Sequence, residues 1–389
     1  MKTSSTAYMR RNSVDERTVL VLFLSYLSFS MFRLSIGMVL PSIISEMRIS
    51  EFQAGILYSI NLLSSAILLT PSGLMADRIG RKRVLILGYL LLAAGVLSFS
   101  SSPNYPLLVV SLTMAGVGSS MIIPSYYSLM GELLRNVRGF GVGLGLASYQ
   151  IGGLMGSYLV GAFVALGNWR TPFIIMGVLE IIALLIQIPL VHSPPSIEEK
   201  PTTFFSLLKM KNILISCTSI FLGSFGYFST TAWLPSLLLS RSIGPIELSL
   251  ILGLFFIGGA MSPPVFGRIS ERIGRRKTTF YVSMAAAVVA AAALLINHSL
   301  ISAICVVLLG IFISPHRSLL VTIVQEAVPG KNISAATGLT QTLGLFGGAV
   351  GPVISGALIT PLTIDHALFY SIVLPNVLCG FITLLIREK

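Results

Sequence analysis

Two arginines stand inside long apolar stretches of the chain, where a charged side chain is costly. Arg33 lies in SMFRLSIG and Arg317 in SPHRSLL, each at least ten residues from either end of its apolar run. An arginine at the centre of a membrane helix costs roughly 2.5–3.5 kcal/mol on insertion scales, so such residues usually face a cavity or a partner. A planar guanidinium binds carboxylates and oxyanions in bidentate fashion. The two side chains therefore predict a binding site for an anion.

The alternative is that acids of the protein itself neutralise the two arginines. Of the fourteen acidic residues, only Glu180 lies deep in an apolar run, whereas Glu132 and Glu326 lie near the ends of theirs. One buried acid cannot neutralise two arginines, which favours a ligand for at least one of them. Glu180 itself is interpreted either as a protonated or hydrogen-bonded scaffold group or as a proton-coupling residue.

His316 is the neighbour of Arg317 and follows Pro315. Proline removes a backbone donor and frees a carbonyl, so the sequence predicts a kink at this point of the helix. Adjacent helical residues point about 100° apart, so His316 and Arg317 need not reach the same ligand. His316 is a candidate for substrate binding and for proton coupling, because imidazole titrates near neutral pH. The alternative is a hydrogen-bonded packing residue.

The elements that must position these groups follow from composition. The chain is 54% hydrophobic and 10% charged, with a mean hydropathy of +0.88, whereas soluble domains carry about 25% charged residues. Apolar runs long enough to cross a hydrocarbon core of about 30 Å recur along the whole length, and helices satisfy their own backbone in lipid. The twelve predicted spans are 18–44, 52–75, 83–102, 105–133, 139–166, 171–191, 212–239, 246–270, 277–296, 299–328, 334–361 and 364–386.

The net charge of +12 is distributed as a topology signal. Of 26 Lys and Arg, 21 fall in the two ends of the chain, in the connections after even-numbered spans, or in the three span residues next to such a connection. The positive-inside rule then places both termini in the cytoplasm. We expect a multi-pass protein of the plasma membrane, with the lipid bilayer rather than a nucleic acid as its partner.

The second half of the chain repeats the first. Chance apolar composition would not keep one register across several separated blocks. The matching positions, at an offset of 194 or 195 residues, include Gly73 and Gly267, Asp77 and Glu271, Gly80 and Gly274, Glu132 and Glu326, Gly143 and Gly338, and Gly161 and Gly356. The same register places Tyr227 opposite Arg33, which makes Tyr227 a further substrate-binding candidate. It places Ile123 opposite Arg317, so neither arginine belongs to the repeated scaffold.

The repeat predicts two parallel six-helix bundles, with a substrate held between them. The predicted boundaries are an N-terminal tail at 1–17, bundles at 18–191 and 212–386, a cytoplasmic linker at 192–211 and a C-terminal tail at 387–389. Other polar or aromatic residues in the spans are candidates for substrate contact or for packing. They are Asn61, Tyr126, Tyr127, Tyr149, Gln150, Trp233 and Gln341.

The stretch GLMADRIGRK at 73–82 carries the most specific motif. It matches G-x-x-x-D-R-x-G-R-[RK] in full, and GRISERIGRR at 267–276 repeats it with Glu271 in place of the aspartate. With the twelve spans and the half-repeat, the whole chain resembles the major facilitator superfamily of secondary transporters. The resemblance implies an all-α membrane fold of twelve helices in two six-helix bundles related by a pseudo-two-fold axis.

The resemblance also implies a conformational latch at this motif. Its acid, Asp77, would face the start of the eleventh helix near Ser334, and Glu271 would face the start of the fifth near Gly139, where helix dipoles favour a negative charge. Glycine would allow close helix approach at Gly73 and a tight turn at Gly80. The alternative is that the basic residues only anchor the topology. The predicted latch residues are Gly73, Asp77, Arg78, Gly80, Arg81, Lys82, Glu271, Arg272, Gly274 and Arg275.

In the family that the chain resembles, the first, fourth, seventh and tenth helices line a central cavity. Arg33 and Arg317 lie on the first and tenth, so we expect a secondary active transporter of a small organic anion, a mono- or dicarboxylate including aromatic acids. It would be a monomer that works by alternating access, with proton symport or anion exchange and no cofactor beyond the proton or counter-anion gradient. The alternatives are transport of an inorganic oxyanion or a sugar, drug/proton efflux, and a transporter-like receptor.

Two further features of the sequence limit these alternatives. The fifth-span segment GGLMGSYLVG lacks the proline that many drug antiporters of the family carry there, which disfavours efflux. The sequence shows no phosphate-binding loop, metal-ligand spacing or catalytic constellation. It therefore predicts neither an enzyme nor a metal site.

Overall fold

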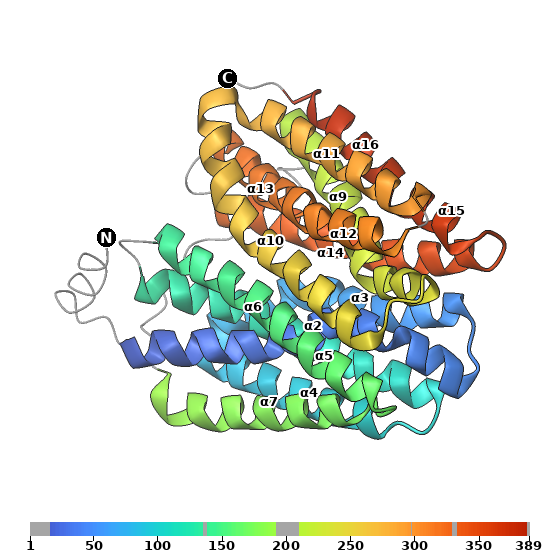
Figure 1. Ribbon diagram of the computed structural model, residues 1–389. Coiled ribbons are helices and arrows are strands. Elements are labelled where there is room, and N and C mark those ends of the chain that lie inside the picture. Colours follow the sequence, from blue (N-terminus) through green and yellow to red (C-terminus); the bar gives the residue numbers. More distant parts are fainter. Residues whose placement is uncertain (1–15, 135–137, 192–209, 297, 329–332, 387–389) are drawn as a thin grey trace.

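The computed structural model describes residues 16–134, 138–191, 210–296, 298–328 and 333–386, and within them it contains helices and no strands (Figure 1). The first half forms one bundle and the second half another. The helices of the first bundle are α2 (Glu16–Met47), α3 (Glu51–Ile79), α4 (Arg81–Ser101), α5 (Tyr105–Leu133), α6 (Arg138–Ala165) and α7 (Thr171–Leu190). Those of the second are α9 (Lys211–Ser240), α10 (Pro245–Ile273), α11 (Arg275–Leu295), α12 (Ser299–Ile313), α13 (Pro315–Ala327), α14 (Ile333–Ile359), α15 (Ile364–Leu368), η3 (Phe369–Val373) and α16 (Leu374–Thr383).

The predicted twelve-span fold is confirmed. Eleven spans of the described chain are long and apolar enough to cross a membrane, and the glycine-rich α6, with 28 residues, is the twelfth. The tenth span consists of α12 and α13, which meet at Ser314, directly before Pro315. Proline has no N–H to continue the helical hydrogen bonds, so the kink predicted there is also confirmed.

Two tight turns repeat in the two bundles. Gly80 joins α3 to α4 with a φ of 101°, and Gly274 joins α10 to α11 with a φ of 91°. Glycine adopts positive φ without a steric penalty, so the role predicted for Gly80 is confirmed and its repeat partner shares it. We call the end of the molecule that carries these two turns the motif side, and the end at residues 47–51 and 240–245 the far side.

The two bundles pack against each other through repeat-related helix pairs. Helix α3 packs on α14, α6 packs on α10, and α2 meets α9 between them. In Figure 1 the two bundles converge at one end and diverge toward the end that carries the N label. The contacts of the interface therefore differ between its two ends.

The surroundings of four glycines show how the contact between the bundles differs between the two ends. Gly161 and Gly356 lie near the far side, where a Cβ would stand 2.4 Å from Ser249 Cβ and from the Glu51 carbonyl oxygen, respectively, both in the opposite bundle. Gly143 and Gly338 lie eighteen residues earlier, which is five turns and thus the same face. A Cβ there would have no atom within 4 Å. The bundles are in contact at the far side and apart at the motif side.

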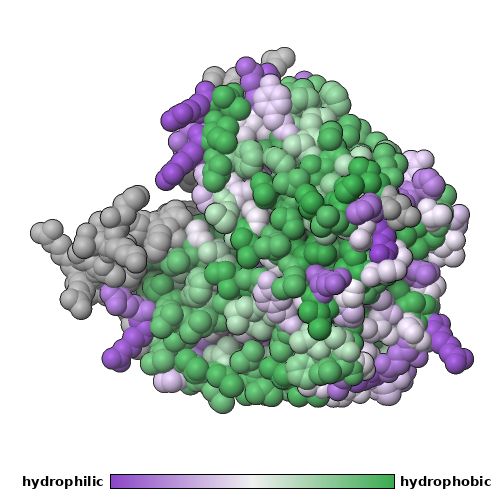
Figure 2. Space-filling model, in the orientation of Figure 1, coloured by the Kyte–Doolittle hydropathy of each residue, from purple (hydrophilic) through white to green (hydrophobic). Residues whose placement is uncertain are grey.

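The outer surface of the bundles is apolar. Figure 2 shows hydrophobic residues over most of the visible face, with hydrophilic residues gathered toward its left and right ends. Large side chains such as Leu90, 52% exposed, and Val288, 68% exposed, point outward. A surface of this kind suits lipid rather than water, so the chain is a multi-pass membrane protein.

We predict that Gly356→Ala lowers the thermal stability of the purified protein, whereas Gly338→Ala does not. The methyl group at 356 would collide with the Glu51 carbonyl oxygen, and overpacking costs about 1–3 kcal/mol. At 338 the methyl meets open space, and alanine favours a helix over glycine by about 1 kcal/mol. The measurement is the melting temperature in detergent. Equal melting temperatures for the two variants would contradict the far-side contact.

Candidate anion-binding site and charged loops

Three of the predicted site residues come together near the middle of the molecule. Arg33 is on α2, Tyr227 on α9 and Arg317 on α13, so both bundles contribute. Arg317 is close enough to Tyr227 for its charge to act on the hydroxyl group, and Tyr58 of α3 lies within the same range of both Arg33 and Tyr227. The structure therefore links Arg33 to Arg317 through Tyr58 and Tyr227, in one cluster of side chains at the bundle interface.

Arg33 is buried without a counterion among the described residues. The residue is only 3% exposed, and the Nη1 atom of its guanidinium makes no hydrogen bond to the described residues. The guanidinium lies over the ring of Phe29, with its Cζ 5.6 Å from the ring centroid. None of the ion pairs between described residues includes Arg33. A cation–π contact offsets only part of the cost of burying the charge, so the site has unused capacity for an anion.

Arg317 is half-buried and faces polar groups. Its Nη2 donates to Oε1 of Gln341 on α14 over 2.5 Å, and its charge acts on the hydroxyl of Tyr127 on α5. An amide oxygen accepts a hydrogen bond but does not neutralise the guanidinium. As with Arg33, no described acid forms an ion pair with it. The remaining donors of its guanidinium can bind a second group.

Tyrosine rings gather around Tyr127, which lies near Arg317. Tyr26 of α2 stacks on Tyr126 with centroids 4.0 Å apart, and Tyr127 meets both rings edge-on. Tyr149 of α6 lies 6.2 Å from Tyr26 and is close enough to Tyr227 to affect its hydroxyl group. Sequence reasoning named Tyr126, Tyr127 and Tyr149 but missed Tyr26 and Tyr58. The signal that was available for Tyr26 is its place on α2, seven residues and two turns before Arg33.

Glu180 lies away from this cluster. It is fully buried on α7 and accepts a hydrogen bond of 3.1 Å from Ser28 Oγ of α2. Ser28 and Arg33 are five residues apart, so their side chains point about 140° apart around the helix axis. Glu180 therefore contacts α2 on a different face from the arginine. It does not neutralise either arginine in this structure.

His316 packs between helices. It is 2% exposed, and a Cβ added to Gly223 of α9 would stand 2.2 Å from its Nε2. Arg317, its neighbour, turns toward Tyr127, Tyr227 and Gln341 instead. The expected divergence of the two side chains is present, and Arg317 is the one that reaches the cluster.

The arginine that follows the turn glycine of each motif copy binds an acid of its own bundle. Arg81 pairs with Glu132 at the end of α5, and Arg275 pairs with Glu326 of α13 over 2.8 Å. The repeat offset of 194 residues relates both members of the two pairs. The buried face of the motif thus ties the second and third helices of each bundle to its fourth.

The next basic residue closes a helix end. Lys82 Nζ donates to the carbonyl oxygen of Ile188 over 2.6 Å, near the end of α7. Arg276, its repeat partner, donates to the carbonyl oxygens of Leu384 and Ile386 beyond α16. A cation at a helix C-terminus satisfies orphan carbonyl groups and complements the helix dipole. The motif therefore also ties the sixth helix of each bundle.

The predicted latch acids are exposed on the motif side. The Asp77 side chain is 62% exposed and lies 3.7 Å from Arg81 of its own bundle, and Arg78, Glu271 and Arg272 are likewise exposed. Residues 329–332 and the side chains near Ser334 and Gly139 lie outside the described part of the chain, so the predicted partners of Asp77 and Glu271 stay predictions. The expectation for Gly73 is wrong in this conformation. A Cβ there would meet only Pro124 Cβ, at an ordinary 3.9 Å.

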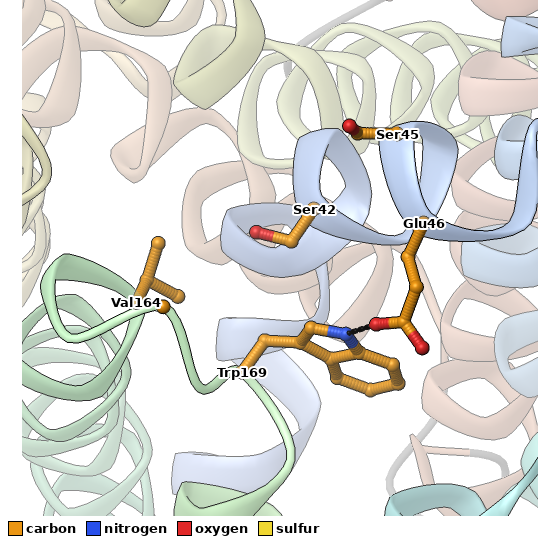
Figure 3. Close-up of a pocket in the computed structure, with 6 residues that line it drawn as sticks. Ser42, Ser45, Glu46, Val164 and Trp169 are labelled. Carbon is orange, nitrogen blue, oxygen red and sulfur yellow. Dashed lines mark hydrogen bonds between the residues drawn. The ribbon is translucent and has the colours of Figure 1, made fainter.

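Ion pairs of inverted polarity hold the far side. Glu46 of α2 binds Arg170 over 2.8 Å and accepts from Trp169 Nε1 over 2.5 Å, beside a cavity of about 260 Å³ (Figure 3). In the second bundle Arg241, directly after α9, binds Asp365 over 2.5 Å. An offset of 195 residues relates Glu46 to Arg241 and Arg170 to Asp365, so the repeat keeps the pair and exchanges the charges.

We predict that Arg81→Gln lowers the melting temperature of the protein, whereas Arg78→Gln leaves it nearly unchanged. The first change leaves Glu132, whose side chain is 22% exposed, without its cation, while the second removes an exposed charge. Unpairing a partly buried ion pair costs more than the 0–1 kcal/mol typical of a surface pair. The comparison by thermal unfolding in detergent is direct, because the two residues flank the same turn at Gly80. A larger effect at 78 would refute the assignment.

Comparisons with known proteins agree with this architecture. The family model of the Major Facilitator Superfamily matches residues 18–244 and 217–389. "Uncharacterized transporter YycB" of Bacillus subtilis (strain 168) is 27% identical over 339 residues, covering 83% of this chain and 82% of its own. "Quinolone resistance protein NorA" of Staphylococcus aureus (strain COL) is 23% identical over 368 residues, covering 87% and 89%.

Two solved structures share the fold at 15% sequence identity. A point mutant of the nucleoside transporter NupG superposes with a TM-score of 0.81 over 96% of this chain and 100% of its own. A bacterial homolog of the human lysosomal transporter Spinster, in an inward-facing and unoccupied conformation, superposes with a TM-score of 0.78 over 96% and 95%. Since the family model covers nearly all of the sequence, the chain belongs to the Major Facilitator Superfamily and is a transporter rather than an enzyme.

Proposed function

We propose that the protein is a secondary active transporter of a small organic anion. The observation that carries this proposal is Arg33, a buried guanidinium with an unpaired N–H and no acid beside it among the described residues. Arg317 supplies a second cation from the opposite bundle, within the same cluster of polar side chains. An anion between them would receive charge-assisted hydrogen bonds from both halves of the molecule.

The tyrosine rings favour an aromatic or otherwise planar carboxylate. Tyr26, Tyr126, Tyr127 and Tyr149 offer ring faces and edges on the motif side of Arg33. Their hydroxyl groups can hydrogen-bond a carboxylate, and their rings can stack on a flat apolar body. A sugar has neither a charge for the arginines nor a flat apolar ring, so the cluster favours an acid over a sugar.

The transport cycle that we propose is alternating access. The bundles touch at the far side and are apart at the motif side, which with the motif loops in the cytoplasm is an inward-open state. The exposed Asp77 and Glu271 would engage the opposite bundle when the motif side closes, and would thereby latch the outward-open state. The ion pairs of Arg81 and Arg275 lie within single bundles and would persist through the cycle.

The coupling mode that we propose is proton symport or anion exchange. His316 and Glu180 are the buried titratable candidates, but each packs outside the cluster in this state. Anion exchange needs only the two arginines, because one anion replaces another at the same cations. The pH dependence of uptake distinguishes these two modes.

Drug efflux is the second candidate function. It is favoured by the similarity to a quinolone resistance protein over 87% of this chain and by the aromatic lining of the cluster. Against it stand the missing fifth-helix proline and two unneutralised cations, which repel cationic drugs. Binding of lipophilic cations rather than anions would favour this second candidate.

We predict that an aromatic carboxylate raises the melting temperature of the wild-type protein and that Arg33→Gln and Arg317→Gln each abolish the shift. A ligand stabilises by RT ln(1 + [L]/Kd), so a ligand at a hundred times its Kd adds about 2.7 kcal/mol. The panel includes aliphatic carboxylates, inorganic oxyanions, sugars and lipophilic cations. Arg48→Gln is the matched control, because Arg48 is exposed at the far side and distant in the fold from the cluster.

Two outcomes would overturn this proposal. If sugars or lipophilic cations shift the melting temperature and no anion does, the arginines are structural and the substrate class is wrong. If an anion shifts the wild type and the Arg33→Gln and Arg317→Gln variants equally, it binds elsewhere. A positive ligand then serves for uptake into proteoliposomes.

We predict that Glu180→Gln binds the anion as the wild type does. Its carboxyl hydrogen-bonds Ser28 on a different face of α2 from Arg33, so it does not compete for the arginine. Uptake measured between pH 5.5 and 8 tests coupling separately. A variant that keeps binding but loses the pH dependence of uptake would assign proton coupling to Glu180, and an unchanged profile would remove it from the candidates.

A further inference from the structure

The interface between the bundles is nearly free of polar side-chain contacts. All five ion pairs of the described residues lie within one bundle or the other. The close inter-bundle contacts pair glycines with backbone, as Gly37 of α2 does with the Thr231 carbonyl oxygen and Gly55 of α3 with that of Pro352. Surfaces without specific polar bonds can separate and rejoin at low cost. A polar bond across such an interface therefore has a disproportionate effect on its opening.

One buried hydrogen bond crosses the membrane interior of this interface. The hydroxyl of Tyr58 on α3 lies 2.8 Å from Oγ1 of Thr231 on α9, and both residues are buried. Among the hydrogen bonds found between described side chains, the other that joins the bundles is the exposed, 3.5 Å contact of Thr360 with Glu51 at the far end. The Tyr58 bond is thus the buried polar link of the far-side closure.

The donor in this bond is defined by the other contacts of Thr231. Its Oγ1 also lies 3.3 Å from the Tyr227 carbonyl oxygen and 3.2 Å from that of Phe228, both in its own helix. A threonine hydroxyl has one hydrogen, which these carbonyl groups receive, and its lone pairs stay free to accept. Tyr58 therefore donates and Thr231 accepts. Removing the tyrosine hydroxyl would leave Thr231 satisfied within α9.

The bond also lies next to the proposed anion site. Gly37, which touches Thr231, is four residues and one turn beyond Arg33 on α2. Tyr227, four residues before Thr231 on α9, belongs to the cluster, and Arg33 acts electrostatically on Tyr58. Binding of an anion at Arg33 would thus take place within one helical turn of the contact between the bundles. The proposed anion site and the far-side contact are therefore neighbours.

We propose that Tyr58 is the far-side gate residue, whose hydroxyl holds the inward-open state closed at the far side by donating to Thr231 across the bundle interface. The bond joins α3 of one bundle to α9 of the other, so it breaks when the far ends of the helices separate. Its loss shifts the balance toward the outward-open state. This proposal rests on the proposed alternating access and does not depend on which substrate is carried.

The test is a distance measurement between the far ends of α2 and α9. Ser45 and Ser240 are exposed there, one in each bundle, and an offset of 195 residues relates them. The substitutions Ser45→Cys and Ser240→Cys introduce the attachment sites for spin labels. The native cysteines, which are buried, are first replaced by alanine; they are Cys217, Cys305 and Cys379. Pulsed electron paramagnetic resonance then gives the populations of short and long distances in proteoliposomes without any substrate.

Tyr58→Phe is expected to raise the ratio of long to short distances roughly five-fold, the effect of one net hydrogen bond. Thr231→Val should raise it at least as much, because it leaves the Tyr58 hydroxyl buried without an acceptor. The double variant should not exceed the larger single effect, since both changes remove the same bond. Tyr105→Phe is the matched control: its hydroxyl donates to the Gln53 carbonyl oxygen over 3.3 Å within one bundle.

Several results would overturn the gate. The proposal is wrong if Tyr58→Phe gives the same ratio of long to short distances as Tyr105→Phe, or if it shifts the population toward short distances. It is also wrong if the effects of the two single variants add in the double variant, or if every variant shows one unchanged distance. Failure of the anion proposal is recognised separately, because it appears in the ligand-induced melting shifts and leaves these substrate-free distances unaffected. A five-fold shift together with no bound anion would keep the gate and reject the substrate class.

Discussion

The absence of water inside the membrane is the constraint on which the rest of this structure depends. A charge or polar group in a helix centre must find its partner within the protein, because lipid offers none. Glu180 accepts a hydrogen bond from Ser28, and Arg317 donates one to Gln341. Within the described part of the chain, Arg33 contacts the face of Phe29 and keeps an N–H without a hydrogen-bond partner. A buried cation with no acid beside it among the described residues is the basis of the proposed ligand site.

The same constraint explains why ion pairs gather at the two ends of each bundle. On the motif side, Arg81 and Arg275 bind acids of their own bundles. On the far side, Glu46 with Arg170 and Arg241 with Asp365 join the ends of repeat-related helices. The exchange of sign between the halves shows that the joint, rather than the identity of either residue, is what the fold requires. Each bundle is thereby fastened internally at both ends and can move as one body.

Hydropathy and charge predicted most of the fold, because a membrane helix must be apolar over a fixed length. The fourth span, 105–133, coincides with α5, and the break before Pro315 separates α12 from α13. The site was predicted in part, since buried arginines are rare enough to be informative alone. Tyr58 was not predicted, because a tyrosine in an apolar run is common and its partner depends on which helix faces meet. Gly73 was assigned a close contact that an open motif side does not contain.

A transporter that alternates between two open states needs an interface between its bundles that is stable in each state but can separate at low free-energy cost. The glycine contacts of Gly37, Gly55, Gly161 and Gly356 provide area without directional bonds, so they separate without leaving polar groups unsatisfied. A single hydrogen bond at Thr231 adds a discrete, small preference for closure. Its magnitude, about 1 kcal/mol net, biases a population without locking it. The interface therefore combines glycine packing that separates at low free-energy cost with one buried hydrogen bond, which lies next to the arginines proposed to bind the substrate.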